Sequence, residues 1–206
     1  MTPRSVSSID TGFDVIEGLV LAVDAKDHYT VAHSQVVADI AVLLAEALGL
    51  PERSTAALRA AGLLHDVGKI SIPDRILRKP AALNEDEWLV MRQHVEFSEL
   101  IVRGVPGLQD ILEPVMHHHE RWDGHGYPRG LAGEAVPLLG RIMIVADAYS
   151  AMVLDRPYRR GLSVEQALAQ LRAGAGTQFD PQLVAVLCDA IRHEQLRDVV
   201  ALALAS

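Results

Sequence analysis

The sequence predicts an all-α fold made of one domain. Apolar residues recur at helical spacing along nearly the whole chain, and no segment shows a convincing alternation of apolar and polar residues with period two. Only 4% of the 206 residues are aromatic, so leucine, valine, isoleucine and alanine must fill the interior, a composition that favours helices. A chain of this length can bury a substantial core as a single unit.

The expected helices begin with an amphipathic segment near the N-terminus. A second helix is expected from about His33 to Ala47, with Gly49 as its C-terminal cap. A third helix should run from about Ser54 to Leu64. The apolar stripe of the first helix consists of Ile16, Leu19, Val20 and Val23.

Capping signals mark the starts of later helices. Asn84, followed by Glu87 three residues on, predicts the start of a helix that carries Met91 and His94. The same kind of signal predicts two further starts, at Ser163 with Gln166 and at Asp180 with Pro181.

Between these helices, one more helix should approach His118 from about Leu108. Two stretches, residues 68–82 and 120–137, are rich in proline or glycine and are expected to be irregular.

The charge and the cysteine content exclude several classes of protein. A net charge of −8 argues against sequence-independent binding to polymeric nucleic acid. The single cysteine, Cys188, lies in an apolar run and is expected in the core, and no disulfide framework can form. Residues 1–10 lack a signal-peptide pattern, and no run approaches the roughly 18 apolar residues of a membrane helix. We therefore expect a cytoplasmic protein without membrane association.

Imidazole and carboxylate side chains occur together at helix ends and on apolar helix faces. His65 and Asp66 end an apolar run, so one helix end offers a ring nitrogen and two carboxylate oxygens. The other members of the set are His33, His94, the adjacent pair His118 and His119, and Asp147. Taken singly, a histidine of this kind is as consistent with a core residue, and a carboxylate with a helix cap. Taken together, they predict a metal centre if their helices converge.

The chemistry of these ligands narrows the choice of metal and reaction. Mixed imidazole and carboxylate sets suit iron, manganese, zinc or nickel better than calcium or magnesium, which prefer oxygen ligands. Two such ions about 3.5–4 Å apart can hold the attacking and leaving oxygens of a phosphodiester while lowering the pKa of a water between them.

Two longer runs and four shorter stretches match one known family. The first run extends from His65 to Ile70, with Ile72-Pro73-Asp74 after it, and the second extends from His118 to Pro128. The shorter stretches are 27–33, 146–149, 155–159 and 176–181. Together they resemble the HD-GYP family, and the similarity extends from about Ala25 to Arg192.

The resemblance implies a single HD-type helical bundle around a buried metal centre. It implies a phosphodiesterase in which a metal-activated water hydrolyses cyclic di-GMP to linear pGpG, and in some members on to GMP. The implied cofactors are two divalent ions, iron or manganese first, with zinc, nickel or cobalt as alternatives. The implied ligands are His33, His65, Asp66, His94, His118, His119 and Asp147, with Asp66 bridging.

Other positions carry over to substrate binding and catalysis. Lys69 matches the family lysine near the scissile phosphate, so Lys69 and Asp66 are the predicted catalytic residues. Arg156 and Arg159 match basic positions that contact phosphate or guanine, although an exposed arginine pair is also common on surfaces. The motif loop, which we define as Gly126, Tyr127 and Pro128, is implied to hold the shape of the site and to contact partner proteins.

Three positions depart from the family pattern. Tyr29 replaces a glutamate found in members with a third metal, so two metals are expected. Ser150 stands where the family often has an aspartate that helps to hold the substrate, so this predicted substrate contact would alter guanine affinity or the choice of substrate. His117 and His125 are additional histidines that are expected at a helix end or in a loop, with a cleft position for His125 as the alternative.

The predicted organisation is a helical extension over residues 1–24, a catalytic domain over 25–195 and a helical tail over 196–206. The extension and the tail would pack internally or against a second copy in a homodimer, and a diguanylate cyclase is the candidate partner of the motif loop. Two other functions stay open. One is an HD hydrolase of another cyclic dinucleotide or phosphoester, and the other is a module that binds cyclic di-GMP without hydrolysing it.

Overall fold

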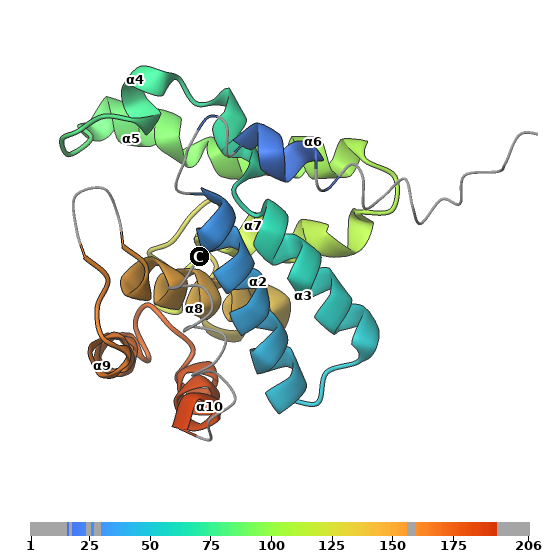
Figure 1. Ribbon diagram of the computed structural model, residues 1–206, viewed down its shortest axis with the longest axis vertical. Coiled ribbons are helices and arrows are strands. Elements are labelled where there is room, and N and C mark those ends of the chain that lie inside the picture. The colour runs from blue at the N-terminus through green and yellow to red at the C-terminus, as the bar shows by residue number, and fades with distance from the viewer. Residues whose placement is uncertain (1–15, 17, 24–25, 27–29, 156–159, 193–206) are drawn as a thin grey trace, which may run out of the picture.

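The computed structural model describes residues 16, 18–23, 26, 30–155 and 160–192 (Figure 1). Within these residues the regular structure is helical, apart from isolated bridges between Asp123 and Ala132 and between Ala175 and Phe179, so the all-α prediction is confirmed. Residues 16 and 18–23 are also helical. The α-helices are α2 (Thr30–Ala47), α3 (Glu52–Leu64), α4 (Asp74–Leu77), α5 (Glu85–Arg92), α6 (His94–Gly104), α7 (Leu112–His117), α8 (Leu138–Val153), α9 (Val164–Gly174) and α10 (Pro181–Arg192), and the 3-10 helices are η1 (Val67–Ser71), η2 (Gln109–Ile111) and η3 (Gly133–Ala135).

Helix α2 lies at the centre of the bundle, packed against α3 and α8 (Figure 1). Helices α9 and α10 pack against α8 and lie below it in this view, and α4, α5 and α6 lie across the opposite end. The core is aliphatic, as the composition predicted, and Cys188 is buried in it. Its largest fully buried side chains include Ile40, Leu44, Leu58, Leu64, Ile142, Met143, Tyr149, Leu171 and Leu187.

Glycines set two features of the α2–α3 pair. Gly49 has φ +66°, and its N–H bonds to the Glu46 carbonyl while that of Leu50 bonds to the Ala45 carbonyl, which confirms the predicted C-terminal cap. A Cβ added to Gly62 would lie 2.4 Å from the Cα of Ala38, so the two helices approach as closely as their backbones allow.

The predicted capping boxes at Asn84 and Ser163 are both present, and Asp180 caps α10 by accepting the N–H of Gln182. The prediction of one helix that carries both Met91 and His94 was wrong. Helix α5 ends at Arg92 and α6 begins at His94, because the imidazole Nδ1 of His94 takes the Met91 carbonyl at 2.7 Å.

The irregular stretches were predicted in part. Residues 68–82 contain most of η1 and the short helix α4, so the prediction of an irregular segment was wrong there. Residues 120–137 contain only the single 3-10 turn η3 and are otherwise irregular, as predicted. The third predicted helix starts two residues earlier than expected, at Glu52.

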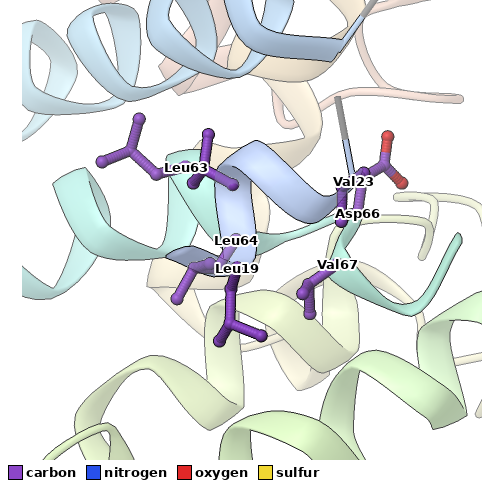
Figure 2. A pocket seen from close by; sticks show the side chains of 7 residues that line it. Leu19, Val23, Leu63, Leu64, Asp66 and Val67 are labelled. Carbon is purple, nitrogen blue, oxygen red and sulfur yellow. The ribbon is translucent and has the colours of Figure 1, made fainter. Parts of the chain in front are cut away.

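The described helical residues near the N-terminus pack against the rest of the domain. Packing within the chain was one of the two arrangements expected for them, and packing against a second copy was the other. Leu19, Val20 and Val23 line a narrow pocket against Leu63, Leu64 and Val67, and Figure 2 shows the Asp66 carboxylate pointing away from these apolar side chains. The pocket measures about 10 Å³, room for roughly one water molecule, so it holds no larger ligand.

The predicted extension and tail fall mostly or wholly outside the described residues. Their boundaries at 24, 195 and 196 therefore stay predictions. In the part of the chain that the structure describes, no helix has both the length and the apolar character needed to cross a bilayer.

Candidate metal centre

The seven predicted ligands come from five different places in the chain and lie together in space. One ligand atom from each of Asp66, His94, His118 and His119 lies within 4.8 Å of the others, and His33, His65 and Asp66 form a second such group. The Asp147 carboxylate lies 3.1 Å from His33 Nε2 and 3.9 Å from His65 Nε2. Asp66 belongs to both groups, which is the arrangement that a bridging carboxylate requires.

Backbone carbonyls fix the orientation of three imidazoles. The Nδ1 atoms of His65, His94 and His118 lie 2.8, 2.7 and 2.6 Å from the carbonyl oxygens of residues 62, 91 and 115, each three positions earlier. A carbonyl oxygen only accepts, so Nδ1 must carry the proton, and in a neutral ring Nε2 then presents a lone pair. Each Nε2 is thereby prepared to bind a metal from within one turn of its own chain segment.

His33 is held from another helix. Its Nδ1 lies 2.9 Å from the hydroxyl of Ser150 on α8, and that hydroxyl is 3.3 Å from the His33 carbonyl. Because the hydroxyl has one proton, donation to the carbonyl leaves Nδ1 as the donor to Ser150 Oγ. His33 Nε2 lies 3.1 Å from a carboxylate oxygen of Asp147, on the side of the other predicted ligands.

Several buried polar atoms at this place make no hydrogen bond within the described part of the chain. They are the Nε2 atoms of His65, His94 and His118 and one carboxylate oxygen of Asp66. Buried polar groups are normally satisfied, because an unpaired one costs about 1–3 kcal/mol. Three imidazole nitrogens and a carboxylate oxygen that converge without partners fit divalent transition-metal ions.

The environment keeps most of the imidazoles neutral. Burial lowers the pKa of His94, lowers that of His118 well below its ordinary value, and lowers the pKa of His119 to about 3. His65 differs: burial lowers its pKa, but the charges of Asp66 and Asp147 outweigh burial and raise it. Neutral rings supply the lone pairs that a metal needs.

The two carboxylates stay ionised. Burial by itself would raise the pKa of Asp66, but the charges of Lys69 and His65 hold it well below its usual range. Burial would also raise the pKa of Asp147, and its hydrogen bond and charge interaction with His33 lower it far more. The centre therefore offers anionic oxygens beside neutral nitrogens, a donor set for a divalent cation.

The turn after α3 places Lys69 beside this centre. A Cβ on Gly68 would lie 2.0 Å from the His94 carbonyl oxygen, so only glycine allows η1 to pack against α6. The Gly68 N–H donates to Ser98 Oγ, which in turn donates to the His65 carbonyl at 2.9 Å. In the middle of η1, Lys69 places its Nζ 2.6 Å from Asp66 Oδ2.

The motif loop covers one side of the centre. The Tyr127 ring stacks on the His119 ring, with the two ring centroids 4.8 Å apart. The Arg92 guanidinium lies over the Tyr127 ring, 5.1 Å from its centroid. The buried Glu120 carboxylate accepts the N–H groups of Arg129 and Leu131 and so anchors the loop. These contacts hold the loop beside His119, and its role in holding the shape of the site stays a prediction.

A cleft of about 740 Å³ opens beside the ligands. His118, His119, Asp147 and Tyr127 line it. His125, whose side chain is 84% exposed, also lines it, which agrees with the alternative position predicted for this residue. His117 is the last residue of α7, as expected. One wall was not predicted: it is formed by Glu85, Trp88, Leu89 and Arg92 of α5. Counted from Glu85, the other three follow at i+3, i+4 and i+7, the spacing of one helix face. That spacing, in a helix whose N-terminal cap was predicted, is the signal that could have identified this wall.

The predicted substrate contacts of Arg156, Arg159 and Ser150 all stay predictions, for two different reasons. Arg156 and Arg159 lie outside the described residues, so their roles stay predictions. Ser150 has no exposed surface, and the contact that the structure gives it is with His33. Its contact with substrate also stays a prediction.

Comparison with known proteins decides the family. The sequence matches the family described as HD domain over residues 20–183. The chain belongs to the HD-domain family. The motifs around Asp66 and Tyr127 place this HD domain in the HD-GYP group, in agreement with the proteins that it is similar to.

This HD domain is similar to signalling phosphodiesterases of bacteria. It is 40% identical over 176 residues to the cyclic di-GMP phosphodiesterase response regulator RpfG of Xanthomonas campestris pv. campestris, covering 84% of this chain and 47% of that protein. It is 38% identical over 182 residues to the 3'3'-cGAMP-specific phosphodiesterase 2 of Vibrio cholerae, covering 87% and 35%. The chain thus spans less than half the length of both relatives.

A solved structure shares the fold of this HD domain. The crystal structure of the V. cholerae cyclic GMP-AMP specific phosphodiesterase V-cGAP3 matches with a TM-score of 0.69 and 19% identity, over 92% of this chain and 52% of that one. At this identity the likeness concerns the fold alone.

Proposed function

We propose that this HD domain is a metal-dependent phosphodiesterase that hydrolyses cyclic di-GMP to linear pGpG. The observation that carries the proposal is the convergence, next to a cleft of about 740 Å³, of ligand atoms from His65, Asp66, His94 and His118 that make no hydrogen bond within the described residues. A cleft of this volume falls within the range of small-molecule sites. The similarity to RpfG, which is named a cyclic di-GMP phosphodiesterase, supports the choice of substrate.

The residues have distinct roles in this reaction. Two divalent ions, iron or manganese first, would be held by the seven ligands and supply Lewis-acid polarisation of the phosphate and acidification of a water. Asp66 and Asp147 provide the negative charge that retains them, and the carbonyl-anchored rings of His65, His94 and His118 keep their lone pairs aimed inward.

Lys69 contributes positive charge at the edge of the centre. Its ammonium group lies 2.6 Å from Asp66 Oδ2 and its side chain is 23% exposed, so it can reach both the centre and a substrate. An ammonium in this place stabilises negative charge on the phosphate and can give a proton to the leaving ribose oxygen.

A second substrate, 3'3'-cGAMP, is favoured by two observations. One relative, 38% identical, is named a 3'3'-cGAMP-specific phosphodiesterase. Ser150 also replaces the aspartate that the family often uses to hold its substrate. Cyclic di-GMP remains the first choice because the resemblance to the HD-GYP family implies it and because RpfG, at 40% identity, is named a cyclic di-GMP phosphodiesterase. Binding of a diguanylate cyclase to the motif loop and formation of a homodimer remain predictions.

The test begins with protein purified without oxygen. Elemental analysis should find about two equivalents of iron or manganese, and the same sample should convert cyclic di-GMP to pGpG, followed by chromatography beside 3'3'-cGAMP and cyclic di-AMP. Asp66→Asn should lose metal and turnover together, whereas Asp110→Asn, which removes only a surface partner of Arg53, should lose neither.

Three outcomes separate the candidate functions. Faster turnover of 3'3'-cGAMP than of cyclic di-GMP would replace the first substrate by the second. A metal-loaded protein that binds cyclic di-GMP and never cleaves it would be a binding module instead. A protein that acquires no transition metal would refute the metal centre itself.

A further inference from the structure

The α5 wall of the cleft has no role in the reaction described above. It consists of Glu85, Trp88, Leu89 and Arg92, which the helix places on one face, and all four line the same cleft as His118 and His119. Trp88 is 47% exposed and Leu89 is 62% exposed, although both are large apolar side chains. Two adjacent exposed apolar residues inside a cleft are a feature of ligand sites.

From this wall we infer that α5 forms a guanine-binding subsite, an inference that rests on the proposed function. Trp88 stacks on the base, Leu89 extends the apolar surface, and the Glu85 carboxylate accepts hydrogen bonds from the base edge. Guanine presents N–H donors at N1 and N2, which an acceptor-only carboxylate satisfies. Adenine presents a lone pair at N1, which a carboxylate repels. The subsite therefore prefers guanine.

Charge supports the assignment of Glu85 as a base contact. A carboxylate lining a cleft for a phosphodiester weakens the attraction of that cleft for its anionic substrate. This cost is offset when donor groups of the ligand face the carboxylate. Asp86 lies one position further along the first turn of α5 and does not line the cleft. Asp86 can interact with the N-terminal helix dipole as Glu85 does, so it serves as the matched control.

Arg92 delimits the subsite on the side of the motif loop. Its guanidinium lies 5.1 Å from the Tyr127 ring centre, and Tyr127 in turn stacks on His119. Positive charge at this end of the wall suits the phosphate that adjoins a bound base. The wall thus offers Glu85 as an acceptor for the edge of the base, Trp88 as an aromatic face for its plane, and Arg92 as a cation for the phosphate.

Steady-state kinetics of metal-loaded protein test the subsite with cyclic di-GMP, 3'3'-cGAMP and cyclic di-AMP. Glu85→Gln should raise KM for cyclic di-GMP roughly tenfold and leave KM for cyclic di-AMP within about twofold, because it removes only base-edge discrimination. Trp88→Ala should raise KM for all three roughly 5- to 150-fold, since stacking tolerates every base. Trp88→Phe should restore most of the affinity, and kcat should change little in each variant.

Two results would overturn the inference. One is an equal effect of Glu85→Gln on guanine and adenine substrates. The other is an effect of Asp86→Asn as large as that of Glu85→Gln, which would assign the change to the helix end rather than to a base contact.

A binding measurement separates this inference from the proposed function. Tryptophan fluorescence is titrated with GMP and with AMP in the wild-type protein and in Trp88→Phe, so that the quenching lost in the variant reports on Trp88. Quenching at lower GMP than AMP concentration, with the preference abolished by Glu85→Gln, supports the subsite even if no cyclic dinucleotide is cleaved. Equal quenching by both nucleotides, or none from Trp88, refutes the subsite even if cyclic di-GMP is hydrolysed.

Discussion

His33 differs from the other buried imidazoles in how its second nitrogen is held. His65, His94 and His118 use carbonyls three residues earlier, whereas His33 uses the hydroxyl of Ser150, which is 117 positions away. This hydrogen bond joins α2 to α8 and determines where His33 Nε2 points. Partners of this kind commonly change metal affinity 10- to 100-fold when they are removed.

Ser150→Ala should therefore weaken metal binding by roughly tenfold. The variant loses the hydroxyl that lies 2.9 Å from His33 Nδ1 and fixes the His33 tautomer. Competition with a chromophoric chelator measures the change. Ser34→Ala is the control, because Ser34 is also buried next to His33 in the chain but its hydroxyl makes no hydrogen bond within the described residues. An equal loss in both variants would show that Ser150 acts through packing alone.

Tyr127 acts on His119 through its ring. The stack at 4.8 Å predicts that Tyr127→Ala lowers metal affinity about 2- to 10-fold, since an aromatic pair contributes about 0.5–1.5 kcal/mol. Tyr127→Phe keeps the ring and should match the wild type in the same chelator competition. If Tyr127→Phe is as impaired as Tyr127→Ala, the hydroxyl rather than the stack is responsible.

At the scale of the elements, the contact between α2 and α3 decides where the His65 and Asp66 pair lies. Gly62 is in contact with Ala38 of α2, and its own carbonyl accepts from His65 Nδ1. One residue thus determines both the spacing of two helices and the direction of a ligand.

Gly62→Ala should lower the free energy of unfolding by about 1–3 kcal/mol, because its Cβ would lie 2.4 Å from the Ala38 Cα and force the helices apart. Thermal denaturation measures the loss, and metal content should fall with it. Gly104→Ala at the end of α6 is the control: no atom lies within 4 Å of the added Cβ, so stability should change by less than about 0.5 kcal/mol. Similar losses in both variants would contradict the close-contact explanation.

The helices were predictable where a local signal specifies them. Capping boxes at Asn84 and Ser163 and the glycine cap at Gly49 were identified because each depends on residues within one turn. The break at Gln93 was not, because apolar spacing continues across it and the cause is a side chain, His94, that takes a backbone carbonyl. Such competition between side chain and backbone leaves no periodic signal in the sequence.

At the scale of the molecule, the metal centre joins several helices of the bundle, so metal should stabilise the whole domain. At a free metal concentration 100 times Kd, binding adds about 2.7 kcal/mol to the free energy of unfolding. For a domain of 206 residues this raises Tm by roughly 5–10 °C. Calorimetry before and after chelation measures the difference. In Asp66→Ala the shift should vanish, and a chelator-independent Tm in the wild type would contradict a bound metal.

The identity of the candidate ligands could be predicted, but their arrangement could not. Residue types suggested His33, His65, Asp66, His94 and Asp147 as candidates, and the resemblance to the HD-GYP family implied that they are ligands. Their convergence depends on how α2, α6 and α8 pack, which is a long-range property of the core. The α5 wall was missed for a related reason: an exposed Trp88 has meaning only once the cleft beside it is known.

The hydrogen bond between His94 and Met91 has a consequence for ligand linkage. The same bond closes the end of α5 and orients the imidazole of a predicted metal ligand, so it links the wall of the cleft to the metal centre. A nucleotide that holds α5 in place would tighten the hold on the metals, and by reciprocity the metals would tighten the hold on the nucleotide by the same factor. Bound substrate would then slow the loss of metal ions from the domain while the substrate occupies the cleft.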